Sequence, residues 1–505
     1  LARSRFSVAS RTPYWIRLKI SGRGPVLIQA KVWKASRSEP AGWTVQTSHA
    51  GPGKLIVRRG SFGFILIHDD VNKRKGRVKV SGVKVLAADR RRLSAPEATF
   101  AFAGRIQPTS GGRYRARAVV KSDIPGTIAF EVGTDPRLRN SAVVSGTEVI
   151  PKANVTKTWL EGLEPGSTVY WRPLLTSRSG RLNQGLIRSF RTPPAPGQEV
   201  SFAFGSCSHS FSTSRSFDTA AGLGPYFFAH LGDFGYPQNP LGSAAATFSV
   251  GSFQDRWTRM LARRSMTNLH RRAAWIMLQD DHDYGMENCW SGNVRRFTVP
   301  AFDELSGNLN ARHFDVRYGD MHCFFIDAHL HSDDPLAPDG PGHSMIGDGQ
   351  KAWLKQSMSS SDAPLLILFS PMPFWGAGFG VTSWKSAFAQ ERRELLDFFA
   401  SLQGPDRRVV ICSGNSHAQV INRHSDPDGG KDVIEFVSSE TDKHLPKQLR
   451  SVPGDGVIDG TRSIKGAEAF GYVRLKAAGN NPRVELRAID SVTGRDVWPM
   501  LAVDL

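Results

Sequence analysis

The stretch Ala273–Asn288, AAWIMLQDDHDYGMEN, carries the strongest fold signal in the sequence, because an apolar run changes there into a dense polar cluster. The run Ala274–Leu278 is short, continuous and rich in aromatic and aliphatic residues, which predicts a strand buried on both faces. Asp280–Asp283 (DDHD) follows almost directly. Three acids and an imidazole this close together require a cation or an ordered hydrogen-bond network. Because ligands collect at the carboxyl ends of strands in open α/β sheets, we expect a functional site here.

Four other apolar runs end in the same way. Each leads into a turn whose side chains can bind a metal: Gly205–His209 (GSCSH), Gly232–Tyr236 (GDFGY), Asp327–His329 (DAH) and Ser413–His417 (SGNSH). A single turn of this kind is most simply explained as a cap after a strand. Five of them in one chain favour a shared site.

The length and composition indicate a folded protein of several domains. A chain of 505 residues with 40% hydrophobic residues, 49 Gly and 30 Pro is too long for one core and suits two to four domains. No apolar run is long enough to span a bilayer as a helix. The chain starts at Leu1 without a signal-peptide core, so we expect a mature or truncated end that begins mid-chain, in a secreted or surface-associated protein.

The formal net charge of +19 and the pI near 10 indicate anionic partners such as phosphate polymers, nucleic acid or an acidic surface. A generally basic surface explains the same charge equally well. Basic clusters such as Lys73–Lys75 and Arg90–Arg92 are scattered, and no nucleic-acid-binding motif accompanies them.

Residues 1–90 and 93–195 are rich in the alternation of apolar and polar positions that is typical of half-buried antiparallel strands. Residues 1–90 resemble part of a concanavalin/laminin-G-like jelly roll through Lys31–Lys34 and Ser38–Trp43, which implies a carbohydrate-binding or spacer role. Residues 93–195 resemble a fibronectin-type-III-like sandwich through Leu163–Tyr170, whose tyrosine hydroxyl is expected to tie a corner to the backbone.

Residues 198–505 alternate buried strands with helical stretches such as Gln390–Ala400, QERRELLDFFA, which indicates an α/β domain. The proline-rich segment Arg191–Gly197 precedes it and predicts a stiff linker. The expected fold class is a multidomain chain in which all-β sandwich modules precede an α/β domain.

The residue types in these turns favour metal chemistry. Asp233 and Tyr236 are three residues apart in one turn, so both side chains can reach one point. The ordinary pKa of tyrosine is about 10, so only a strongly charged cation makes its phenolate a ligand near neutral pH. With Cys207, Asp281 and His417 this gives a mixed set of hard and soft ligands, which favours a redox-capable transition metal, ferric iron first, over zinc alone.

Further oxygen ligands, including Asn415, suit a second and harder ion such as calcium, magnesium or manganese. Two cations a few ångströms apart activate a water and hold the oxygens of an in-line phosphoryl displacement. A serine hydrolase is disfavoured because no G-x-S-x-G turn is present. Cys207 is disfavoured as a phosphatase nucleophile because Thr213, not an arginine, stands six residues on.

The motifs GSCSH, HLGDFGY, DDHDYG, FIDAH and SGNSH, with Ile346–Leu354, Trp384 and Glu391–Arg392 between the last two, resemble the PhoD-like alkaline phosphatase/phosphodiesterase family of metallophosphoesterases in order and spacing. The resemblance covers about residues 198–505, and the preceding sandwich is the family's usual N-terminal companion. It implies a two-layered β core flanked by helices, an α/β/β/α sandwich. It also implies a phosphoester hydrolase site built on Fe³⁺ and Ca²⁺, with Mg²⁺, Mn²⁺ or Zn²⁺ as alternatives for the second ion.

The resemblance also implies roles by position. The implied metal ligands are Cys207, Asp233, Tyr236, Asp281, Asn415 and His417, with Asp233 shared by the two ions. The implied catalytic residues are His282, which would face the developing phosphate charge or the leaving oxygen, and His329. Asn288 and Trp384 are implied contacts of the substrate, although core packing explains Trp384 equally well.

Two positions depart from the family pattern, which usually has Asp in place of Asn415 and Arg in place of His329. The first change removes a negative charge, and the second replaces a permanent bidentate phosphate clamp by a group that is only partly charged at neutral pH. These departures keep a second hypothesis open, a surface or phage-tail-type glycan-binding adhesion protein whose phosphoesterase domain has drifted and is inactive. The first hypothesis predicts hydrolysis of extracellular phosphate esters, on a polyanionic polymer or a phospholipid head group, with glycan binding by the N-terminal modules.

Overall fold

The computed structural model describes residues 14–21, 26–34, 45–49, 96–144, 154–177, 179–210, 212, 214–236, 249–308, 312–374, 382–424, 433–441, 462–465, 468–476 and 482–505. The chain forms two compact units, Leu1–Leu86 and Ala87–Leu505. The second unit spans both ranges, 93–195 and 198–505, that the sequence assigns to the sandwich and to the α/β domain.

The first unit contains a three-stranded antiparallel sheet of β1 (Tyr14–Ser21), β2 (Val26–Lys34) and β3 (Val45–His49). Antiparallel pairing is what the alternating sequence of this region predicts. The segment Ser38–Trp43, on which the jelly-roll resemblance partly depends, lies outside the described residues.

The second unit begins with a β-sandwich. One sheet contains β4 (Ala98–Pro108), β5 (Tyr114–Ser122) and β8 (Val155–Leu163). The other contains β6 (Gly126–Gly133), β7 (Ala142–Val144), β9 (Thr168–Ser177), β10 (Leu182–Gln184) and β11 (Arg188–Arg191). Buried side chains from both sheets, including Leu160 and Trp171, belong to one apolar cluster.

The corner between β8 and β9 differs in detail from the expectation. The Thr192 hydroxyl donates to the carbonyl of Glu164 at 2.6 Å and accepts from the backbone N–H of Ser167 at 2.9 Å. Among the hydrogen bonds of the described residues, those of Thr192 rather than of the Tyr170 hydroxyl close this corner.

Two large sheets form the centre of the α/β part. The six-stranded sheet has the order β14-β13-β12-β22-β23-β24 and the seven-stranded sheet the order β15-β16-β17-β18-β20-β19-β21. The strands are β12 (Val200–Gly205), β13 (Phe227–His230), β14 (Ala274–Met277), β15 (Phe314–Tyr318), β16 (Met321–Phe325), β17 (Leu365–Ser370), β18 (Arg408–Ser413), β19 (Ala418–His424), β20 (Val433–Ser438), β21 (Arg462–Lys465), β22 (Ala469–Lys476), β23 (Arg483–Asp490) and β24 (Leu501–Asp504).

The two sheets pack face to face, and aromatic rings form the contact between them. Phe202 and Phe204 of the six-stranded sheet meet Phe369 and Phe436 of the seven-stranded sheet, with ring centroids 5.1 Å apart in the pairs Phe202–Phe369 and Phe204–Phe436. Both pairs are edge-on, an arrangement that aromatic rings prefer over face-to-face stacking. The apolar, doubly buried strands predicted from the sequence therefore form a core between two sheets.

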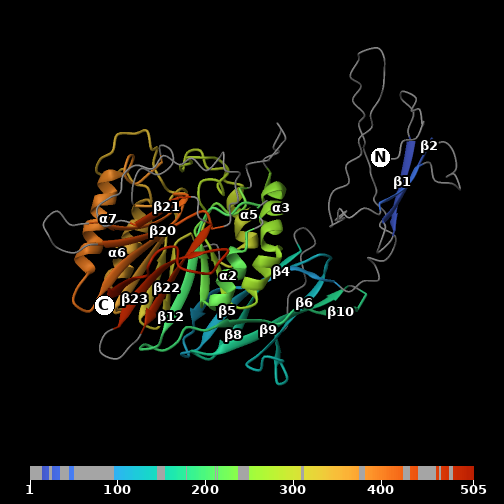
Figure 1. The fold of residues 1–505 in the computed structure, drawn as a ribbon, viewed down its shortest axis with the longest axis horizontal. Coiled ribbons are helices and arrows are strands. Elements are labelled where there is room, and N and C mark those ends of the chain that lie inside the picture. Colours follow the sequence, from blue (N-terminus) through green and yellow to red (C-terminus); the bar gives the residue numbers. More distant parts are fainter. Residues whose placement is uncertain are drawn as a thin grey trace, which may run out of the picture. The chain divides into compact units, whose positions relative to one another are not determined.

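Helices cover the outer faces of both sheets, on opposite sides in Figure 1. The helices α2 (Ser216–Leu223), α3 (Val250–Leu261), α4 (Arg264–His270) and α5 (Thr298–Leu305) share an apolar cluster with the six-stranded sheet. The helices α6 (Asp348–Ser359) and α7 (Ala389–Leu402) share another with the seven-stranded sheet. The resulting layers are helix, sheet, sheet and helix.

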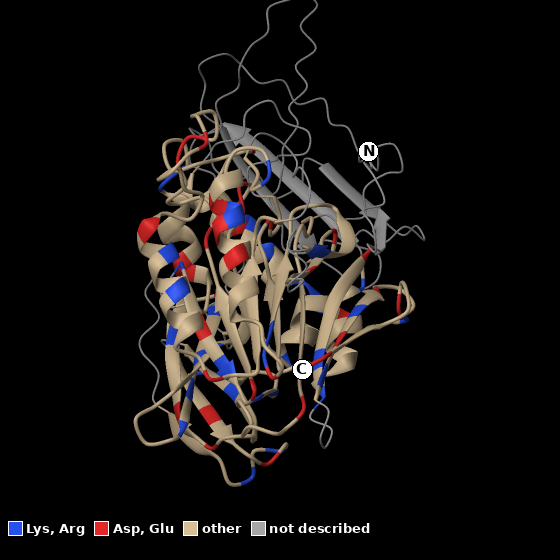
Figure 2. Ribbon diagram, turned by 90° about the vertical axis from the view of Figure 1, so that its left-hand side faces the viewer, with Lys and Arg blue, Asp and Glu red and all other residues tan. Residues whose placement is uncertain are grey.

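Charged residues are spread over the described part of the chain. Figure 2 shows basic and acidic positions interspersed along helices and strands. Within the described ranges, no helix combines the length and the apolar character needed to cross a membrane.

Candidate metal centre

The turns predicted to carry ligands lie at the carboxyl ends of parallel strands. β12, β13 and β14 are parallel neighbours in one sheet, and β16, β17, β18 and β20 are parallel neighbours in the other. The turns that follow β12, β13, β14 and β18 bring together side chains from both sheets. This is where ligands are expected in α/β sheets.

Two groups of potential ligand atoms form at this edge. In the first, atoms of Cys207, Asp233 and His417 lie within 4.8 Å of one another, and in the second the same holds for Asp233, Asp281 and His282. Asp233 belongs to both groups. Five residues that are up to 210 positions apart in the sequence therefore offer one thiol, two carboxylates and two imidazoles around a shared carboxylate.

Tyr236 lies beside Asp233 and Cys207 of the first group. Its side chain is almost fully buried, and its ring centroid lies 4.7 Å from that of His282 and 5.6 Å from that of His209. Burial first, then the negative charges of Asp233 and Cys207, raises the pKa of Tyr236 well above its usual range. His209, the last residue of the GSCSH turn, is buried beside this tyrosine.

The buried acids have the electrostatics of a cation site. Burial, together with the charges of Cys207, Asp281 and Asp280, raises the pKa of Asp233 well above its usual range, although the imidazole of His282 acts in the opposite direction. Asp233 Oδ1 and His282 Nδ1 are both buried, and neither has a hydrogen-bond partner among the described residues. Unpaired buried polar atoms are costly, and a cation bound at Asp233 removes that cost for its carboxylate. The residues present therefore fit a metal.

The backbone of the ligand turns is strained. Cys207, Asp233, Tyr236, Asn415 and His417 all have positive φ, between 47° and 59°. Residues other than glycine rarely adopt this conformation, and such strain persists where the surrounding structure holds it in place, often at functional sites. Two further non-glycine residues with positive φ near this edge are Asn288 (φ 56°) and Glu440 (φ 65°).

Asp283 holds two of these turns together, a role that the sequence did not reveal. Its carboxylate accepts hydrogen bonds from the backbone N–H groups of Asp233 (2.6 Å) and Asp280 (3.2 Å) and from the indole of Trp257 (3.1 Å). Burial raises the pKa of Asp283 to about 7. Close packing supports the same junction, because a Cβ at Gly232 (φ 105°) would collide with the backbone of Asp280.

His329 is not a member of either group of ligand atoms. The side chain is fully buried, with Nε2 2.6 Å from Asp280 Oδ1 and Nδ1 3.0 Å from the carbonyl oxygen of Cys289. Burial alone would lower the pKa of His329, but the contacts with Cys289 and Asp280 raise it well above its usual range. Nε2 is engaged in the ion pair with Asp280 and Nδ1 in the contact with the carbonyl oxygen of Cys289, so the ring supports the structure here. Its predicted catalytic role stays a prediction.

Trp384 lies in the core. It is fully buried, and its ring stacks on Phe374 with centroids 4.5 Å apart, inside the cluster between the seven-stranded sheet and its helices. This placement favours core packing, the alternative that the sequence allowed, and a contact of Trp384 with the substrate stays a prediction.

The two asparagines lie in the ligand turns. The backbone N–H of Asn288 donates to Asp281 Oδ2 at 2.8 Å, so this residue orients a proposed ligand. The backbone N–H of Asn415 donates to Ser206 Oγ at 3.0 Å, and its side-chain amide faces Met372 Sδ at 3.1 Å. Asn415 thus fixes the turn that presents His417.

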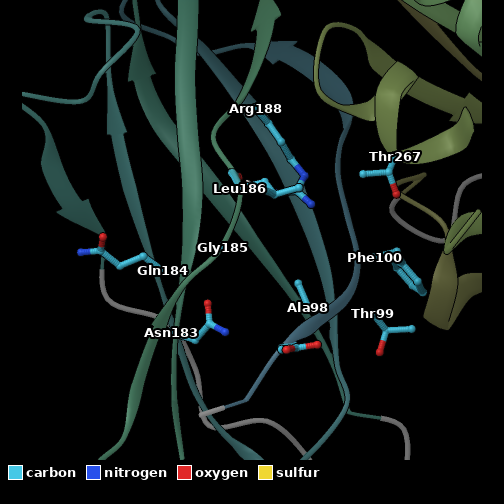
Figure 3. Close-up of a pocket in the computed structure, with 10 residues that line it drawn as sticks. Ala98, Thr99, Phe100, Asn183, Gln184, Gly185, Leu186, Arg188 and Thr267 are labelled. Carbon is cyan, nitrogen blue, oxygen red and sulfur yellow. Dashed lines mark hydrogen bonds between the residues drawn. The ribbon is translucent and has the colours of Figure 1, made fainter. Parts of the chain in front are cut away.

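One cavity of about 230 Å³ lies elsewhere, between the sandwich and α4 (Figure 3). Its lining includes Glu97, Asn183, Gln184, Arg188 and Thr267. The Arg188 guanidinium is already bound to the carbonyls of Ala101 and Leu186. None of the proposed ligands lines this cavity, so it is separate from the metal centre.

Comparison with known proteins shows similarity to one phosphatase family. The model of the PhoD-like phosphatase family matches residues 298–486. Alkaline phosphatase D of Bacillus subtilis (strain 168) is 25% identical over 453 residues, which cover 76% of this chain and 74% of the relative.

Two solved structures share the fold. A structure of PhoD superposes with a TM-score of 0.62 at 18% identity, over 80% of this chain and 88% of that one. The purple acid phosphatase PPD1 from yellow lupin seeds superposes with a TM-score of 0.58 at 11% identity, over 81% of this chain and 74% of the other. These matches do not favour the adhesion hypothesis. Residues 298–486 thus match the PhoD-like phosphatase family, and the chain is a metal-dependent phosphoesterase.

Proposed function

We propose that the enzyme hydrolyses phosphate esters at two metal ions that share Asp233. Cys207, Asp233, Tyr236 and His417 would hold Fe³⁺, and Asp233 and Asp281 would hold Ca²⁺, with Mg²⁺, Mn²⁺ or Zn²⁺ as alternatives. The observation that carries this proposal is the membership of Asp233 in both groups of ligand atoms. Asn415 would contribute an uncharged oxygen, so the site carries one negative charge fewer than the family pattern.

The ligand types favour a different kind of ion at each of the two positions. A thiolate and a phenolate suit a transition metal, whereas carboxylate and amide oxygens suit a hard divalent ion. When bound, such a pair of ions supplies an activated water and neutralises charge that develops on the phosphoryl oxygens.

The protein residues supply the remaining chemistry. We assign His282 to the leaving oxygen, where its imidazole donates a proton or a hydrogen bond. The buried Nδ1 of this residue has no hydrogen-bond partner among the described residues. His329 acts indirectly, because its ion pair with Asp280 fixes the turn that contains Asp281 and His282.

The charge distribution supports a polyanionic substrate. Residues 1–86 contain 18 Lys and Arg but only 3 Asp and Glu, whereas the whole chain contains 65 and 46. Most of the net positive charge therefore belongs to the N-terminal unit, outside the hydrolase. We propose that this unit concentrates an extracellular phosphate polymer or an anionic phospholipid surface near the enzyme, and that the same unit contacts glycans.

The proposal is tested with p-nitrophenyl phosphate and bis(p-nitrophenyl) phosphate, which separate monoesterase from diesterase activity. Asp233→Asn should lower kcat/KM for the preferred ester by at least about 10²-fold, and chelation followed by metal add-back should abolish and restore wild-type activity. Asp255→Asn, an exposed carboxylate paired with Arg259, is the matched control and should retain activity. Full activity of Asp233→Asn, or of the wild type after complete metal removal, would overturn the proposal.

A further inference from the structure

Glu440 is a buried carboxylate next to the candidate metal centre. It lies in the turn after β20, is 7% exposed and has a φ of 65°. Its Oε1 lies 3.1 Å from Nδ1 of His417. A charged side chain with a strained backbone, in contact with a proposed ligand, requires an explanation.

The turn that carries Glu440 is fixed to two ligand turns. The backbone N–H of Thr441 donates to the carbonyl of Ser206 at 3.0 Å, and that of Ser439 donates to the carbonyl of Ala418 at 3.2 Å. Gly205 permits this approach, because a Cβ there would collide with Thr441 Oγ1. The turn therefore lies between the residues that precede Cys207 and those that follow His417.

The Ser206 side chain strengthens the connection. Its hydroxyl donates to Ser439 Oγ at 3.2 Å and accepts from the backbone N–H of Asn415 at 3.0 Å. One serine thus links the turns of Cys207, Asn415 and Glu440. The carboxylate is held at a defined distance from the imidazole of His417.

We propose that Glu440 is a positioning residue that accepts a hydrogen bond from Nδ1–H of His417 and thereby presents Nε2 to the metal. Histidine ligands commonly donate their second ring N–H to a carboxylate, which fixes the tautomer and the ring orientation and makes the ligand more basic. This inference rests on the proposed function, because it assumes that His417 binds an ion.

The test compares Glu440→Ala and Glu440→Gln with the wild type in the full chain. Metal-free protein is titrated with Co²⁺, and two quantities are measured: the dissociation constant and the thiolate-to-cobalt charge-transfer absorption. Glu391→Gln is the control for stability, because Glu391 is an equally buried carboxylate that binds Ser344 and Met345 in the outer helical layer. Melting temperatures are recorded for all variants.

We expect Glu440→Ala to weaken Co²⁺ binding by about 10- to 100-fold while the thiolate band persists at saturation. Glu440→Gln should recover part of the affinity, because its amide oxygen still accepts from Nδ1–H. Glu391→Gln should bind Co²⁺ as the wild type does, even if its melting temperature falls.

Two results would overturn the role of Glu440. One is a Glu440→Ala dissociation constant within twofold of the wild-type value. The other is equal weakening in Glu440→Gln and Glu440→Ala together with a changed cobalt spectrum at saturation, because it would make Glu440 a ligand itself. Failure of the wild type to bind Co²⁺ would instead contradict the proposed function, so the two failures are distinguishable.

Discussion

The Sγ of Cys207 lies 3.4 Å from Oδ2 of Asp233, although the two residues belong to turns that follow different strands. The backbones of these turns are also joined, since the N–H of Cys207 donates to the carbonyl of Gly232 at 3.1 Å and that of Ser208 to the carbonyl of Asp233 at 3.0 Å. The thiol and the carboxylate are therefore placed by the backbone itself. A metal that binds there meets ligands that are already arranged.

Tyr236→Phe should remove the colour of the iron-loaded protein. A tyrosinate bound to ferric iron absorbs visible light by charge transfer, and phenylalanine has no oxygen to bind. The visible spectrum provides the measurement, and circular dichroism with the melting temperature checks that the fold is kept. A colourless wild type with zinc as its only transition metal would refute the iron assignment.

His282→Ala should lower kcat by about 10²–10⁴-fold, the usual contribution of a general acid or base. Its metal content should stay at the wild-type level if the imidazole acts on the leaving oxygen. Kinetics and elemental analysis of the same preparation provide the comparison. Because His282 also lies within ligand distance of Asp233 and Asp281, loss of a metal in this variant would make it a ligand and contradict the assigned role.

The buried imidazole of His270 should lower the free energy of unfolding of the protein as the pH falls below about 6.5. Burial between Phe102 and Trp275, with a smaller effect of Arg188, lowers the pKa of His270 to about 3. An unfolded chain takes up a proton on this imidazole near pH 6.5, but the folded chain does not. Each pH unit between about 6.5 and 3 therefore lowers the free energy of unfolding by about 1.4 kcal/mol.

His270→Phe should therefore flatten the fall in melting temperature between pH 7 and pH 5. His331→Asn, a change at an exposed histidine, is the control and should leave the profile unchanged. Parallel profiles for the wild type and His270→Phe would show that this imidazole does not remain neutral in the folded protein.

Rising ionic strength should lower kcat/KM more for polymeric substrates than for small ones. Capture of a polyanion by the basic N-terminal unit weakens as the Debye length falls from about 10 Å at 0.1 M to about 3 Å at 1 M, whereas a small aryl ester held mainly by the metals responds less. We expect a steeper fall of kcat/KM with ionic strength for a polymeric phosphodiester than for a p-nitrophenyl ester. Deletion of residues 1–90 should reduce only the polymer activity, and equal salt slopes with no effect of the deletion would contradict this.

Much of the site follows from one sequence signal, an apolar run that ends in a polar turn. That signal located Cys207, Asp233, Asp281 and His417, because parallel strands in a sheet place their carboxyl ends at one edge. The same signal exists at Val433–Thr441, so Glu440 could have been found in this way.

Other features could not be predicted because they depend on contacts between distant segments. The signal marked His329, but only the structure shows that its ring pairs with Asp280. Likewise, the spacing of Trp384 does not distinguish a pocket wall from a core residue, and the stacking on Phe374 favours the core residue. The role of Asp283 depends on backbone N–H groups up to 50 residues away, which side-chain patterns do not reveal.

The most direct test of the central claim, two metal ions that share Asp233, is the elemental analysis of purified wild-type protein and Asp233→Asn. We expect about one iron and one divalent ion per chain in the wild type. Asp233→Asn should lose both ions, because its amide is a poor bridge between two cations. A wild type without stoichiometric metal, or an Asp233→Asn variant that keeps both ions, would contradict the claim.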